Sequence, residues 1–280
     1  MPTRTITLLS DWGTSDHYAA VVRAKLYAKL PDVRVVDISH SVPRDDIYAA
    51  ALMAFDTYPY FPEGTVHIIG VDDIASPENA HLLVKFDNHF FIGADNGFFS
   101  VLQSLSGKNA EAVYEIDIWQ ETEVYTFPAR DLFPKVAAML AMGTPPDQIG
   151  HPVKFRSKML DGGLFVQNTL EKDRNGNITG MLLTGRVMFT DGFGNIVTNI
   201  TKAQYTACLQ EYSFVDLRVD WRKFDGKFVD AYMDVVAGDI AFIFLENGFL
   251  EISVNRDNAA NLLGVNDGAK VVIRFGFPKR

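Results

Sequence analysis

The segment TITLLSDWGTSDHYAAVVRAKLYAKLPDVRVVDIS, residues 5–39, carries the pattern that decides the fold. A short apolar run opens it, and an alanine-rich stretch predicts a helix over 16–30 with Asp16 as its N-cap. Pro31 then ends the helix, because proline cannot continue one. A second apolar run follows at 33–39. Strand, helix and strand in this order predict a βαβ unit at the start of an α/β domain.

The alternation of strands and helices continues to about residue 160. Asp87-Asn88 separates two strand-like runs and predicts a hairpin turn. Gly143, followed by two prolines, predicts the end of a helix. The further elements expected here are helices at about 45–58, 98–105 and 132–142, and a buried strand at 65–71.

Beyond residue 160 the pattern changes to glycine-punctuated strands. IAFIFLE and FLEISVN are separated by Asn247-Gly248, which is a strong hairpin signal. The sequence therefore predicts an α/β first domain, a mixed sheet flanked by helices, over residues 1–165. A smaller, mainly β second domain is expected over 166–280.

Composition excludes several classes of partner. The formal charge is −9 without a long Lys or Arg cluster, which argues against nucleic acid. No apolar run reaches the ~18 to 20 residues of a membrane span, and Asp11 interrupts any signal-peptide region, so we expect a cytosolic protein. The six histidines lack metal-ligand spacing, and Cys208 is the single cysteine. No metal site and no cofactor are expected.

Polar residues stand where the first-domain strands end, which is where α/β folds place ligand contacts. Asp11 follows the first strand in SDWGTSD and could accept two hydrogen bonds from a sugar diol. Asp72 follows the strand at 65–71 and is a candidate base or orienting carboxylate, with a turn or cap carboxylate as the alternative. Asp95-Asn96-Gly97 is typical of a turn and helix cap.

A further cluster lies in the second domain, in TDGFGNIVTNI. It holds Asp191, Phe193 and Asn195 within five residues. A carboxylate for an ammonium group, a ring to stack on a base and an amide to read the base edge would form one wall of a nucleoside pocket. A simple hairpin turn is the alternative.

Seven strings taken in order resemble the family of S-adenosylmethionine hydroxide adenosyltransferases, which also contains the fluorinating and chlorinating enzymes. The strings are SDWGTSDHYAAVVRA, VVDISHSVP, FPEGTVHIIGVD, GADNGFFSVL, TFPARDLFPKVAAMLAMG, DGFGNIVTNI and NGFLEISVNRDNAANLLG. The resemblance covers almost the whole chain. It implies an α/β first domain, an all-β barrel as the second domain, and a homotrimer whose sites lie between the first domain of one subunit and the second domain of its neighbour.

The resemblance also implies roles for the polar clusters. The aspartate that holds the ribose diol falls on Asp11. The residues that contact the methionine and adenine parts of the substrate fall on Asp191, Phe193 and Asn195. S-adenosylmethionine enters as the substrate, so the implied partner is a small nucleoside.

The part of the family pattern that handles the nucleophile is altered. Family hydrolases usually read VDPGVGT-x-RR and TFHGRD, whose aspartate, first arginine and histidine surround the attacking water. This chain keeps the aspartate as Asp72 but carries Asn79 at the arginine and Pro128 at the histidine. Ala129 stands where halogenating enzymes commonly have a halide-contacting serine, so halogenation is not expected.

Two hypotheses follow from these departures. In the first, the protein hydrolyses S-adenosylmethionine to adenosine and L-methionine, with Asn79 hydrogen-bonding the water and Asp72 accepting its proton. In the second, it is a catalytically silent or repurposed relative that binds S-adenosylmethionine, adenosine or a related nucleoside. The sequence leaves the role of His81, close to Asn79, open.

Overall fold

The computed structural model describes residues 5–74, 76, 79–119, 126–155 and 166–278. It divides into two compact units, residues 1–161 and 162–280, and each unit is described by itself. The expected boundary after residue 165 adjoins a segment outside the described residues, and its position stays a prediction.

The first unit is built on a seven-stranded mixed sheet with strand order β2-β1-β3-β5-β4-β6-β7. Strands β2, β1, β3 and β5 pair in parallel, and β4, β6 and β7 add antiparallel pairs. The strands are β1 (Thr5–Ser10), β2 (Arg34–Ser39), β3 (Val66–Gly70), β4 (His81–Phe86), β5 (His89–Ala94), β6 (Ala112–Ile116) and β7 (Gly150–Pro152). The predicted βαβ opening is confirmed.

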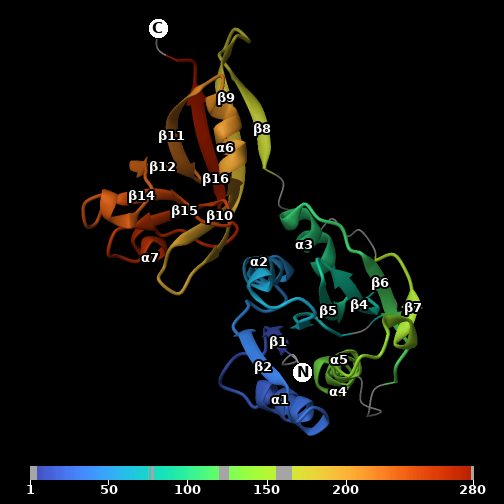
Figure 1. Cartoon of the computed structure of the whole chain (residues 1–280). Coiled ribbons are helices and arrows are strands. Elements are labelled where there is room, and N and C mark those ends of the chain that lie inside the picture. The colour runs from blue at the N-terminus through green and yellow to red at the C-terminus, as the bar shows by residue number, and fades with distance from the viewer. Residues whose placement is uncertain (1–4, 75, 77–78, 120–125, 156–165, 279–280) are drawn as a thin grey trace. The chain divides into compact units, whose positions relative to one another are not determined.

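Helices cover both faces of this sheet, with α1, α4 and α5 on one side and α2 and α3 on the other (Figure 1). Alternate residues of β1, Ile6 and Leu8, pack against Val22 and Leu26 of α1 and against α5. The helices are α1 (Tyr18–Lys29), α2 (Ile47–Thr57), α3 (Phe98–Ser106), α4 (Pro128–Asp131) and α5 (Phe133–Ala141). Two 3-10 turns, η1 (Tyr58–Tyr60) and η2 (Pro146–Gln148), complete the unit.

One predicted helix start is wrong. Helix α1 begins at Tyr18, its N-cap position is His17, and no side chain caps it. Asp16 therefore belongs to the loop after β1. By contrast, the hairpin predicted at Asp87-Asn88 is confirmed, because both residues have positive φ (49° and 62°) between the antiparallel strands β4 and β5.

The second unit is a mostly-strand, barrel-like sheet of nine strands with order β12-β11-β16-β9-β10-β15-β14-β13, and β8 pairs with β9. The long strand β9 pairs with β16 along its first part and with β10 near its end, so it links the two parts of the curved sheet (Figure 1). The strands are β8 (Gln167–Lys172), β9 (Ile178–Thr190), β10 (Ile196–Thr201), β11 (Ser213–Val219), β12 (Arg222–Phe224), β13 (Gly226–Phe228), β14 (Ile240–Phe244), β15 (Phe249–Val254) and β16 (Lys270–Gly276).

Aliphatic and aromatic side chains fill the interior of this unit, among them Leu183, Phe242 and Ile273, all fully buried. Two short helices and a 3-10 turn accompany the strands: α6 (Lys202–Leu209), α7 (Ala259–Leu263) and η3 (Tyr232–Asp234). The hairpin predicted at Asn247-Gly248 joins β14 to β15, with Gly248 at φ 85°. Among the described residues no helix is long and apolar enough to cross a membrane.

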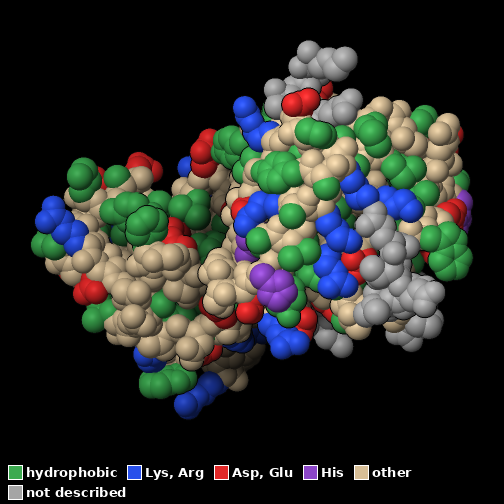
Figure 2. All heavy atoms as spheres, turned by 90° about the horizontal axis from the view of Figure 1, so that it is seen from below, with side chains coloured by type: hydrophobic (Ala, Val, Ile, Leu, Met, Phe, Trp, Pro, Cys, Tyr) green, Lys and Arg blue, Asp and Glu red, His purple; other side chains and the backbone are tan. Residues whose placement is uncertain are grey.

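The face of the molecule drawn in Figure 2 carries charged side chains of both signs. Figure 2 shows Lys and Arg side chains interspersed with hydrophobic, acidic and uncharged surface on the face drawn.

Candidate active site

The ends of two neighbouring parallel strands place Asp11 beside Asp72. Ser10 at the end of β1 is in register with Gly70 at the end of β3, and Asp11 N donates to Gly70 O at 3.4 Å. Both aspartates line a pocket of about 650 Å³, a size typical of small-molecule sites. The described lining consists of Asp11, Trp12, Tyr18, Arg44, Asp45, Asp72, Asp73, Ile74, Thr126, Phe127 and Arg130.

Asp11 is held by the loop before α2. Its Oδ2 accepts a hydrogen bond from Asp45 N at 3.0 Å, and Asp45 adopts a positive φ of 58°. This bond fixes the orientation of the carboxylate at the pocket wall. A fixed carboxylate is suited to accept hydrogen bonds from a diol.

Aromatic side chains form the rest of this wall. Trp12 stacks on His40 with ring centroids 5.5 Å apart and meets the edge of Phe127 at 5.2 Å, and Phe127 meets Tyr18 at 5.4 Å. Trp12 lies directly over Gly70, where an added Cβ would come within 2.3 Å of the indole ring. The glycine therefore permits the ring to close the pocket floor.

The turn after β3 carries two consecutive carboxylates. Asp72 is exposed and has a positive φ of 43°. Asn96 holds this turn by donating through Nδ2 to the carbonyl oxygens of Val71 and Asp72, both at 3.0 Å. Its Oδ1 accepts from Phe98 N at 3.1 Å at the start of α3. Asn96 thus closes the turn that leads into α3, whose N-cap position is Gly97, and also orients the turn that presents Asp72.

Asp73, which the sequence patterns did not single out, is the buried member of the pair. It is 8% exposed and lines the same pocket. Its Oδ2 accepts a hydrogen bond from Ala129 N at 3.2 Å. Burial raises the pKa of Asp73 to about 7, against the opposing effect of the Ala129 N–H, and the nearby charges of Asp11 and Asp72 add to the rise.

His81 lies behind Asp73. Its Nε2 is 2.9 Å from the carbonyl oxygen of Asp73, and because a carbonyl only accepts, Nε2 carries the proton. Burial lowers the pKa of His81, against the opposing effect of its hydrogen bond to the Asp73 carbonyl, and so favours the neutral ring. The ring also packs edge-on against Phe133, at 5.1 Å. Since His81 is not among the described lining residues, its contacts give it a role in holding the backbone of Asp73.

The TFPARD segment begins α4 and has Pro128 and Ala129 at the two positions where relatives carry reactive or halide-contacting side chains. Pro128 opens α4, Ala129 is fully buried, and Arg130 forms an ion pair with Asp131. Asn79 pairs through its backbone with Ser76 and does not occur among the described lining residues of the pocket. Of the predicted pair Asp72 and Asn79, only Asp72 is therefore among the described residues that line the pocket.

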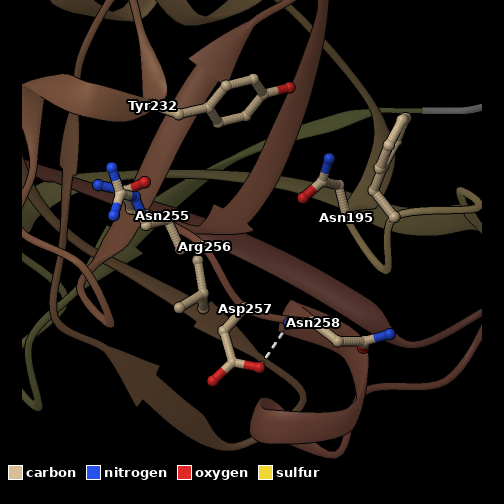
Figure 3. A pocket seen from close by; sticks show the side chains of 8 residues that line it. Asn195, Tyr232, Asn255, Arg256, Asp257 and Asn258 are labelled. Carbon is tan, nitrogen blue, oxygen red and sulfur yellow. Dashed lines mark hydrogen bonds between the residues drawn. The ribbon is translucent and has the colours of Figure 1, made fainter.

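A second pocket, of about 600 Å³, lies in the second unit (Figure 3). Phe193, which is 83% exposed, lines this pocket. Asn195 lines it from the turn before β10 and Tyr232 from η3 (Figure 3). The remaining lining comes from the end of β15 and the residues just after it: Val254, Asn255, Arg256, Asp257 and Asn258. An exposed ring beside amide groups suits a planar heterocycle with hydrogen-bonding edges.

Asp191 organises the loop that carries these residues. Its Oδ1 accepts from Phe193 N at 2.9 Å and from Asn195 N at 2.8 Å, and its Oδ2 accepts from Asn195 Nδ2 at 3.2 Å. These bonds show the turn-forming role that the sequence left open.

Two further residues near this pocket could not be singled out from sequence. Burial raises the pKa of Glu251, and a hydrogen bond with Tyr232 opposes that rise. Tyr232 reaches the pocket from η3. Tertiary packing alone brings it beside β15.

Among the described residues no group of three His, Cys, Asp or Glu side chains could hold a metal ion.

Two family models match the chain. The model for the N-terminal domain of the SAM (S-adenosylmethionine) hydroxide adenosyltransferases matches residues 6–150. The model for the C-terminal domain matches residues 185–272. Together they cover most of the first unit and the barrel-like part of the second.

Individual relatives agree with this match. The chain is 29% identical to the (R)-S-adenosyl-L-methionine hydrolase of Thermus thermophilus, over 96% of this chain and 98% of the relative. It is 27% identical to the hydrolase of the same name from Methanocaldococcus jannaschii, over 93% and 92%. A fluorinase from an Actinoplanes species is 23% identical over 70% of this chain and 71% of the relative.

A solved structure confirms the fold. An uncharacterized conserved protein from Thermotoga maritima is 26% identical and superposes with a TM-score of 0.82, over 96% of this chain and 99% of that one.

Proposed function

Because the chain belongs to the S-adenosylmethionine hydroxide adenosyltransferase family, we propose that it hydrolyses S-adenosylmethionine to adenosine and L-methionine. The observation that carries this proposal is the similarity to named hydrolases over nearly the full length of both chains. The two pockets supply polar and aromatic groups of the kind a sulfonium nucleoside needs.

The reaction is a displacement at C5′ of the ribose. Water attacks C5′, the C5′–S bond breaks, and methionine leaves as a neutral thioether that needs no acid. The protein must hold the substrate and place the water in line, and positioning of this kind contributes roughly 7 to 11 kcal/mol at best. We assign the ribose diol to Asp11. Asp72, which the sequence predicted to accept the proton of the water, is exposed in the folded turn, and we assign to it the orientation of the water.

The second unit supplies the groups for the rest of the substrate. The exposed Phe193 ring is available for stacking on adenine, and the Asn195 amide for its edge. We assign the methionine ammonium to Asp191 and retain Asn79 as a predicted contact of the water. Halogenation is not proposed, since Ala129 offers no hydroxyl to a halide.

A direct assay tests the proposal. The purified protein is incubated with S-adenosylmethionine in water enriched in ¹⁸O, and the products are separated by chromatography. We expect adenosine that carries ¹⁸O at the 5′ position, together with one methionine per adenosine. Adenosine binding without product above a heat-inactivated control would instead establish the silent, nucleoside-binding alternative.

We include a homotrimer, with sites shared by adjoining subunits, and a cytosolic location in this proposal. The family resemblance supports the first and the sequence composition the second. Light scattering coupled to gel filtration measures the mass of the assembly. A monomer that turns over substrate would contradict shared sites.

Replacing Asp11 by Ala is expected to raise the KM for S-adenosylmethionine about 10- to 100-fold. A hydrogen bond to a charged group contributes about 1.5–3 kcal/mol, and the diol would lose its acceptor. The decrease in kcat is expected to be smaller. Asp147→Ala, at an exposed position, is the matched control. An unchanged KM would remove Asp11 from the site.

Replacing Asp72 by Ala is expected to lower kcat at least tenfold, because the water loses the carboxylate that orients it. Asp72→Asn keeps an oxygen and an N–H at the same place and is expected to retain more activity than Asp72→Ala. Steady-state rates of adenosine formation measure both. Equal rates in the wild type and Asp72→Ala would contradict the assignment.

A further inference from the structure

We propose that Asp73 is the general base of this site, the group that takes the proton from the attacking water. This inference rests on the proposed function and deepens it. It assigns a catalytic step to a residue outside the motif positions, next to the carboxylate that the family pattern points to.

Asp73 is fixed on two sides. Its carboxylate accepts from Ala129 N at 3.2 Å, and its carbonyl oxygen accepts from His81 Nε2 at 2.9 Å. At 8% exposure it is nearly buried, yet it lines the pocket that also holds Asp11 and Asp72. A carboxylate held in this way can face a bound water without first losing a mobile solvent shell.

The other groups of the pocket are less suited to the task. Asp11 is held by Asp45 N and is assigned to the diol. Asp72 is exposed. Pro128, beside the Ala129 N–H, has no acid–base group, and the guanidinium of Arg130 is paired with Asp131. Of the described lining residues, Asp73 is therefore the buried carboxylate that remains for the proton.

The charges around Asp73 favour a base that works near neutral pH. Asp11 from the end of β1 and Asp72 from its own turn are acidic, and burial lowers the pKa of His81 from β4. Arg130 from α4, and Arg44 with its partner Asp45 from the loop before α2, line the same pocket. Burial, with the two neighbouring carboxylates, places the pKa of Asp73 at about 7, which matches the requirement for a general base at neutral pH.

The step balances without a further reactant. The water oxygen forms a bond to C5′ while the C5′–S bond breaks, and the bonding pair goes to sulfur. One water proton passes to the Asp73 carboxylate, and the other stays on the new 5′-hydroxyl of adenosine. The protonated Asp73 then releases its proton to solvent before the next turnover.

The test compares the wild type with Asp73→Asn, which keeps the size of the side chain and an oxygen that can accept from Ala129 N. We expect kcat to fall about 10²- to 10⁴-fold, the usual contribution of a positioned base. The Kd for adenosine, measured by calorimetry, is expected to stay within about threefold. In the wild type, kcat is expected to fall with decreasing pH below about 7, and Asp72→Asn is expected to keep this acidic limb.

A second variant separates lost chemistry from lost structure. Asp73→Ala leaves space for a small carboxylate, and added formate is expected to restore part of kcat while added chloride does not. If the wild type turns over S-adenosylmethionine and Asp73→Asn is equally active, the inference is overturned and the proposed function stands. A wild type without turnover would overturn the proposed function itself, and the inference with it.

Discussion

Asp73→Asn is expected to gain stability relative to the wild type as the pH rises, by about 2–3 kcal/mol between pH 5 and pH 8.5. Burial raises the pKa of Asp73 from 3.8 to about 7 in the folded protein. Between these values the folded state binds more protons than the unfolded state, so the free energy of unfolding falls with increasing pH. The contribution of Asp73 to the free energy of unfolding is fully present below pH 3.8, the pKa in the unfolded chain. It is lost as the pH rises through about 7, the pKa in the folded protein.

Urea unfolding at several pH values gives the free energy of unfolding of the variant and of the wild type. In the difference between the two free energies, the contributions of all titrating groups that the two proteins share cancel. The neutral amide of Asn cannot titrate, so the two curves should diverge above pH 5. Asp147→Asn, at an exposed position, is the matched control and should run parallel to the wild type. A constant difference across this range would contradict the raised pKa and weaken the assignment of Asp73 as the base.

The sequence predicted most of the first unit because its signals are local. Asp87-Asn88 predicted a hairpin, since two adjacent positive φ angles favour these residue types. The helix start at Asp16 was predicted wrongly. An aspartate before an alanine-rich run fits an N-cap, but the helix begins only at Tyr18 and has no side-chain cap.

The site was predictable in outline but not in its chemistry. Asp11 and Asp72 follow strands, and strand ends are positions that sequence can locate. The adjacent residues Asp72 and Asp73 are chemically identical, and only the folded turn makes one exposed and the other buried. His81 was similarly ambiguous, because its contact with the Asp73 carbonyl depends on where β4 begins relative to that turn.

Gly194→Ala is expected to destabilise the protein by about 2–4 kcal/mol and to weaken adenosine binding at least tenfold. Gly194 has a φ of 88°, which costs an L-residue roughly 1–2 kcal/mol. Its new Cβ would lie 2.1 Å from Cγ of Asn258, so something must shift. Asn258 cannot withdraw freely, because its Oδ1 accepts from Asn261 N at 2.8 Å and caps α7.

Two other glycines separate the contributions to this effect. Gly192 has open space around it and no positive φ, so Gly192→Ala should change the free energy of unfolding by less than about 0.5 kcal/mol. Gly238 has a φ of 89° in open space, so Gly238→Ala should show the backbone strain alone. A Gly194→Ala variant no less stable than Gly238→Ala would mean that the Asn258 side chain moves aside at little cost. If that variant also bound adenosine normally, the loop from Asp191 to Asn195 would not form the nucleoside wall, and the proposed roles of Phe193 and Asn195 would fall with it.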